Sequence, residues 1–66
     1  MINTIKQDLK RINKNQVWLV FKLRDVGMRI TPSELSNCIN GVLVTPKSHR
    51  VIREAEKIIK QEEQAS

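Results

Sequence analysis

The amino-acid sequence predicts an all-α domain, a compact four-helix unit formed by residues 1–66. Three observations lead to this prediction. Apolar side chains recur every three or four positions in segments 2–12, 16–26 and 46–62, which is the spacing of one helix face. Segment 31–41 is shorter and carries a helix signal at each end. A chain of this length has room for a small core and for no deep cleft.

The first helix is expected from about Asn3 to Ile12. Its apolar residues share one face: Ile2, Ile5, Leu9 and Ile12. The segment 13–15 is a polar break, and the Asn15 side chain is suited to cap the next helix. Basic amphipathic segments of this kind also lie on membrane surfaces, but this one lacks the bulky aromatic face that such binding needs.

The second helix is expected from about Gln16 to Val26 and is ended by Gly27. Its core-facing stripe consists of Leu19, Val20 and Leu23. Three further apolar side chains lie on its flanks: Val17, Trp18 and Phe21. Because one short helix carries so much apolar surface, we expect burial on more than one side. The extra face would meet the first helix, the last helix or a second subunit.

The third helix is expected over 32–40, with both ends marked in the sequence. The Thr31 hydroxyl can cap the first turn, Pro32 suits the first helical position, and Glu34 can close a capping box. Gly41 ends the helix. The core-facing residues are Leu35, Cys38 and Ile39, and the outward ones are Ser33, Ser36, Asn37 and Asn40. Such a helix can enter a DNA major groove, although an ordinary surface helix is also polar outside.

The fourth helix is expected from about Pro46 to Glu62, with Thr45 as its cap, while the tail 62–66 frays. Its apolar residues recur at helical spacing: Val51, Ile52, Ala55, Ile58 and Ile59. The apolar run 42–44 precedes this helix. We expect the run to pack back onto the core, since a β-strand there would have no neighbour with which to pair.

Positive charge is concentrated in the first 50 residues. The chain has 12 Lys and Arg against 7 Asp and Glu, a net charge of +5 and a pI near 9.9. Residues 1–50 contain nine basic and three acidic side chains, whereas residues 51–66 contain three and four. A basic body favours a polyanionic partner. The alternative is a solvated surface of ordinary sign imbalance.

The sequence gives little support for an enzyme or a metalloprotein. Cys38 is the single cysteine, so no internal disulfide can form, which suits a reducing cytosol. His49 has no second metal-type ligand nearby, and no titratable pair suggests acid–base catalysis. We expect no catalytic residue, metal, cofactor or small-molecule substrate. We also expect no membrane span and no signal peptide, since Lys6, Asp8 and Lys10 interrupt the only candidate.

The residues between 16 and 50 resemble a known motif. Its elements appear here in this order: Gln16, Leu19-Val20, Leu23, Thr31, Leu35-Ser36 and Asn40-Gly41. They resemble the helix-turn-helix of phage Cro and repressor proteins and their bacterial relatives, the lambda-repressor-like DNA-binding domains. One spacing departs from the family, because Gln16 and Thr31 are fifteen positions apart rather than closer together. Either the second helix is extended or the connection 24–30 is an open loop.

The resemblance implies which residues contact DNA. The positions where the family reads base edges are Pro32, Ser33 and Asn37, with Ser36 adjacent. The positions near the phosphates are Gln16, Thr31, Asn40, Lys47, Ser48 and His49. The resemblance implies a transcriptional regulator of phage or mobile-element type in the bacterial cytoplasm or nucleoid.

Such a regulator would bind a palindromic operator in double-stranded DNA as a homodimer. We expect the dimer interface at Ile58 and Ile59, or alternatively at Trp18 and Phe21. Ile58 and Ile59 could instead simply cover the first helix. A different function is a small helical adaptor that binds and inhibits a host protein. The surplus apolar surface at Val17, Trp18 and Phe21 supports that alternative.

Overall fold

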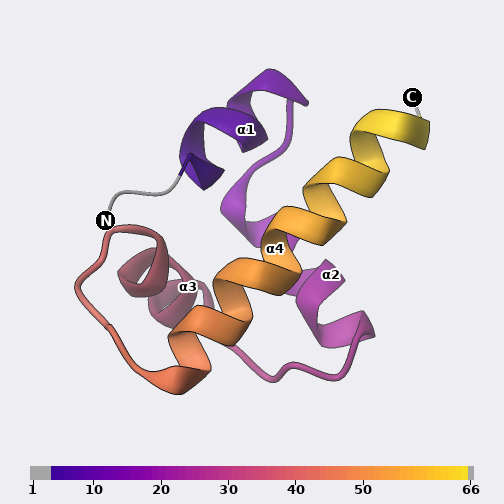
Figure 1. The fold of residues 1–66 in the computed structure, drawn as a ribbon. Coiled ribbons are helices and arrows are strands. Elements are labelled where there is room, and N and C mark those ends of the chain that lie inside the picture. The colour runs from indigo at the N-terminus through magenta and orange to yellow at the C-terminus, as the bar shows by residue number, and fades with distance from the viewer. Residues whose placement is uncertain (1–3, 66) are drawn as a thin grey trace.

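The computed structural model describes residues 4–65, and these residues form four helices without a β-strand. The helices are α1 (Ile5–Arg11), α2 (Gln16–Asp25), α3 (Pro32–Ile39) and α4 (Pro46–Ala65). The predicted all-α four-helix fold is therefore confirmed. The longest helix, α4, packs against each of the other three, and α2 also packs against α3 (Figure 1). Expected residues Ile2, Asn3 and Ser66 lie outside the described part.

The core is one cluster to which every helix contributes. The buried apolar residues are Ile5, Leu9, Leu19, Val20, Leu23, Ile30, Leu35, Cys38, Ile39, Val51, Ala55, Ile58 and Ile59. Each helix buries its apolar stripe against α4 or α2, as the spacing predicted. No helix within residues 4–65 combines the length and the apolar character needed to cross a membrane.

Helices α1, α2 and α3 end in the same way, with a residue of positive φ after the last turn. These residues are Asn13 (φ 61°), Gly27 (φ 89°) and Gly41 (φ 76°). At each end, the N–H of the following residue donates to a carbonyl five positions earlier, over 2.9 Å. This is the Schellman arrangement, and it satisfies carbonyls that the helix would otherwise leave unpaired.

The sequence also marks the helix starts. The Asn15 side chain accepts the N–H of Trp18 at 2.9 Å, and the Thr31 hydroxyl accepts the N–H of Glu34 at 3.1 Å. The Thr31 hydroxyl also donates to the Glu34 carboxylate at 3.3 Å. These bonds fix the start of α3.

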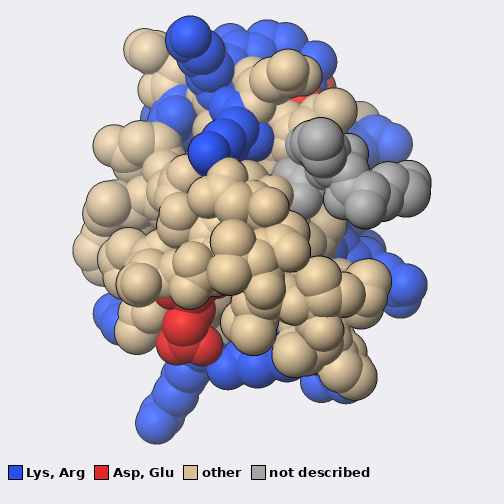
Figure 2. Space-filling model, turned by 90° about the vertical axis from the view of Figure 1, so that its left-hand side faces the viewer, with Lys and Arg blue, Asp and Glu red and all other residues tan. Residues whose placement is uncertain are grey.

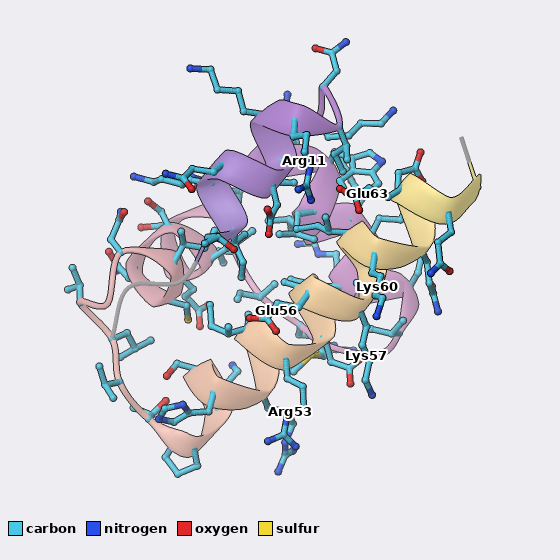
Figure 3. All side chains as sticks on the ribbon, turned by 45° about the horizontal axis from the view of Figure 1, so that its top comes forward. Arg11, Arg53, Glu56, Lys57, Lys60 and Glu63 are labelled. Carbon is cyan, nitrogen blue, oxygen red and sulfur yellow. The ribbon has the colours of Figure 1, made fainter. Side chains whose placement is uncertain are left out.

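Two sequence expectations are wrong. Helix α4 does not end at Glu62 but continues to Ala65, and an ion pair between Arg11 and Glu63 ties its last turn to α1 (Figure 3). The run 42–44 does not pack onto the core. The side chains of Val42 and Val44 are 75% and 68% exposed.

Candidate nucleic-acid interface

Helix α3 presents a polar face to solvent and is held from beneath by the core. Its buried residues are Leu35, Cys38 and Ile39. On the opposite face, Ser33, Asn37 and Asn40 are exposed and Ser36 is half-buried. Asn40 donates to the Ser36 hydroxyl at 3.3 Å, whereas the Asn37 amide makes no side-chain hydrogen bond among residues 4–65. The Asn37 amide is therefore available to an external partner.

The start of α3 joins three of the predicted residues in one place. Pro32 is exposed, while the Thr31 hydroxyl is engaged by Glu34 at the cap. The Lys47 ammonium lies 3.6 Å from the other oxygen of the Glu34 carboxylate. The Lys47 and Glu34 side chains are 60% and 42% exposed, so solvent weakens the pair and it contributes little to stability. Lys47 can therefore leave Glu34 for a phosphate at small cost.

Ser48 does not have the role that the resemblance implied. It is only 4% exposed, and its hydroxyl accepts the Thr45 N–H and donates to the Thr45 carbonyl, both at 2.8 Å. The Thr45 hydroxyl in turn accepts the Ser48 N–H at 3.1 Å. Ser48 is thus part of the cap of α4 and has no group left for a phosphate. The neighbouring His49 is exposed, and Gln16 is half-buried at the start of α2.

The connection between α2 and α3 is a six-residue loop, 26–31, and not an extension of α2. The Met28 N–H donates to the Leu23 carbonyl, Met28 packs against the core, and Ile30 is 3% exposed. The loop is therefore anchored at two points. Arg24, Arg29, Ile30, Thr31 and Glu34 line an open hollow beside the first turn of α3. No motif in the sequence marks Arg24 or Arg29, although the unusual spacing from Gln16 to Thr31 indicates this region.

The surface around α3 has an uncharged centre and a charged edge. Figure 2 views the side on which α3 and the connection 40–45 lie in Figure 1. Uncharged residues fill the middle of this face, Lys and Arg side chains lie around its edge, and acidic side chains lie below the middle and near the upper edge. Amides and hydroxyls are among the groups that read base edges, and phosphates on either side attract cations. The distribution is compatible with a groove-binding face.

Of the two alternatives for Ile58 and Ile59, a dimer contact or a place in the core, the single chain has them in its core. Ile58 and Ile59 are 9% and 2% exposed because they belong to the core of the monomer. The alternative flank on α2 is open instead: Val17 and Phe21 are 50% and 60% exposed. Trp18 is half-buried between the ammonium groups of Lys14 and Lys22, which lie 5.7 and 5.8 Å from its ring centre.

Cys38 lies beneath the polar face and is a core residue. Burial, and to a smaller extent the Glu34 carboxylate, raises the pKa of its thiol, and this outweighs the opposite effect of Lys47. The protonated thiol is a poor nucleophile and a poor metal ligand. No group of His, Cys, Asp or Glu in residues 4–65 is arranged to hold a metal ion. Comparisons with protein-family models, curated proteins and solved structures give no match for this chain.

Proposed function

We propose that this chain is a sequence-specific double-stranded DNA-binding regulator of the Cro and repressor type. The observation that carries the proposal is α3: its outer face offers Ser33, Asn37 and Asn40, and its inner face is locked into the core. The helix that precedes it, α2, packs against it in helix-turn-helix order. The reading helix is thus rigid, capped and accessible, as a helix that enters a groove must be.

Size and charge support the same proposal. An α-helix with its side chains is about 10–12 Å in diameter, which fits the major groove with its width of about 12 Å. The Asn37 amide can pair with both N6 and N7 of adenine. The exposed cations Lys47 and Arg29 lie near the start of α3, where they can meet the phosphates of the groove wall.

We further propose that the protein binds as a homodimer. One α3 reads only a few base pairs, which is too little for tight specific binding, whereas a two-fold pair doubles the contact. The exposed Val17 and Phe21 on α2 are the apolar residues that support a contact between two copies. The C-terminal Ile58 and Ile59 are not available for it.

Selection of bound sequences from a random duplex pool tests the proposal directly. A defined palindromic product is expected, with half-sites about one helical turn apart. Recovery of no common sequence would contradict the proposal.

Asn37→Ala then tests the reading helix. It should weaken binding to the selected duplex by about 1–3 kcal/mol and leave binding to random duplex nearly unchanged. Gln61→Ala is the matched control, because it removes an exposed amide at the far end of α4. Equal losses on both duplexes would show that α3 is not the reader.

A second candidate function is an adaptor that binds a host protein. The exposed Val17 and Phe21 favour it, as do Val42 and Val44, because exposed apolar side chains are typical of protein interfaces. Salt dependence separates the two functions. Binding to duplex DNA should weaken steeply with added salt, whereas apolar capture of a protein should change little.

A further inference from the structure

Two arginines whose side chains have no partner among residues 4–65 line the hollow beside α3. Arg24, at the end of α2, and Arg29, in the connection 26–31, both line it. Neither side chain makes an ion pair or hydrogen bond with any residue between 4 and 65. Surface Arg side chains often form ion pairs with carboxylates. Two Arg side chains without such a pair at one hollow therefore require an explanation.

The one acidic group at the hollow is already engaged. The Glu34 carboxylate accepts the Thr31 hydroxyl through one oxygen and lies beside the Lys47 ammonium through the other. Its charge is thus balanced by Lys47. The two guanidinium groups therefore leave the hollow with a net positive charge, which favours an anionic ligand.

The backbone that carries Arg29 is held in place on both sides. Met28 donates its N–H to the Leu23 carbonyl at 2.9 Å and packs on the core. Ile30, the next residue after Arg29, is buried at 3% exposure. Arg29 thus projects from a fixed point, so that less conformational entropy is lost when its guanidinium binds.

The hollow also adjoins the exposed polar face of α3, the face proposed to contact base edges. Thr31 lines it, and Pro32 and Ser33 follow as the first exposed residues of α3. A DNA phosphate at the hollow would belong to the wall of the groove that α3 enters. Guanidinium groups suit this ligand, because their paired N–H donors match two phosphate oxygens.

We infer that Arg24 and Arg29 together form a binding site for one DNA phosphate, and that the lengthened connection between α2 and α3 places Arg29 at the same hollow as Arg24 of α2. The inference rests on the proposed function. It adds a site on the α2–α3 side of α3, where the helix-turn-helix resemblance implies only Thr31, the last residue of this connection.

The test compares Arg24→Ala/Arg29→Ala with Arg53→Ala on the selected duplex and on random duplex. Arg53 is the matched control, because it is exposed, makes no ion pair and extends from α4 away from α3 (Figure 3). The double variant should bind both duplexes more weakly, on the order of tenfold. The slope of log K against log salt should fall by about one, as expected for one phosphate lost. Arg53→Ala should keep the wild-type slope.

A second measurement varies the DNA instead of the protein, so that a folding defect in the double variant cannot produce the expected result. A neutral methylphosphonate is placed at each phosphate of the selected duplex in turn. One position should weaken the wild type and have no effect on the double variant. Arg24→Lys/Arg29→Lys keeps the charge without the paired donors, so it should recover the slope but only part of the affinity.

The outcomes are distinguishable. If the wild type binds DNA but the double variant keeps its slope and its full methylphosphonate pattern, the phosphate site is overturned and the proposed function stands. If the wild type shows no salt-dependent duplex binding, the proposed function fails, and the phosphate site fails with it.

Discussion

The two connections on either side of α3 begin alike and end differently. The second residue of each is a glycine of positive φ, Gly27 or Gly41, and each carries the same pair of helix-closing hydrogen bonds. Each then carries apolar residues. In the connection 26–31 these residues enter the core, and Ile30 is 3% exposed. In the connection 40–45 they face solvent, and Val44 is 68% exposed.

The difference follows from the last turn of the preceding helix. In one case the residue whose carbonyl accepts the first N–H after the glycine is buried, and in the other it is exposed. In a Schellman ending, the residue after the glycine lies over the residue whose carbonyl accepts its N–H. Met28 donates to Leu23, which is buried, so Met28 is directed toward the core. Val42 donates to Asn37, which faces outward, so Val42 is directed into solvent. The location of an apolar residue after a helix thus depends on the face of the preceding turn as well as on hydrophobicity.

The largest expected effect is a difference in the free energy of unfolding between variants of the two connections. Ile30→Ala should lower the free energy of unfolding by about 2–5 kcal/mol, because it opens a cavity in the core. A domain of this size has little stability to spare, so the milder Ile30→Val, at about 0.5–1.5 kcal/mol, provides a measurable step. Val44→Ala should change stability by less than about 0.5 kcal/mol. Urea unfolding followed by helicity measures all three. Similar losses for Ile30→Ala and Val44→Ala would contradict the packing difference.

The next largest expected effect is a loss of stability when either glycine is replaced, and it should be equal in the two connections. Gly27→Ala and Gly41→Ala should each cost about 1–2 kcal/mol, because alanine is strained at positive φ. A Cβ atom at either glycine would meet nothing within 4 Å, so backbone strain is the whole effect. Gly27→Asn and Gly41→Asn are the controls, since asparagine tolerates this conformation and should recover part of the loss. A clearly larger loss at one glycine would show that the two endings are not equivalent.

Local signals in the sequence were sufficient for the fold. Thr31, Pro32 and Gly41 marked the ends of α3, and helical spacing separated its buried face from its polar one. These features depend on residues a few positions apart, where side chains act on their own backbone. The four-helix prediction and the two faces of α3 could therefore be derived before any tertiary contact was known.

Long-range contacts account for what the sequence did not reveal. The extension of α4 to Ala65 is accompanied by the Arg11–Glu63 ion pair, which joins residues at opposite ends of the chain. Helical spacing marks Ile58 and Ile59 as apolar, but it cannot say whether α1 or a second copy covers them. Arg24 and Arg29 became a candidate site only when the loop 26–31 set them around one hollow.

The start of α4 offers a smaller effect that tests the revised role of Ser48. Ser48→Ala removes a hydroxyl that both accepts from and donates to the Thr45 backbone, so it should cost about 1–2 kcal/mol. Ser33→Ala, at an exposed position of α3, should cost much less. The affinity for duplex DNA should be unchanged in Ser48→Ala at a temperature where the variant is fully folded. An equal loss of affinity on selected and random duplexes would instead return Ser48 to the phosphate contacts.

The smallest effect concerns the reactivity of thiols toward an alkylating reagent. It compares a position in the connection 40–45 with Cys38 of α3 in the same molecule. Val44→Cys places an exposed thiol in the connection 40–45, while Cys38 stays in the core. Burial raises the pKa of Cys38, so at any given pH it holds less thiolate than an exposed cysteine. Alkylation by iodoacetamide should therefore modify position 44 first. Its rate should level off above its ordinary pKa of about 8.5, while Cys38 still reacts slowly. Peptide mass spectrometry distinguishes the two sites, and helicity confirms that the fold is kept. Equal rates in the folded protein would mean that the core side of α3 opens to solvent, and α3 would then lack the fixed support that the proposed function requires.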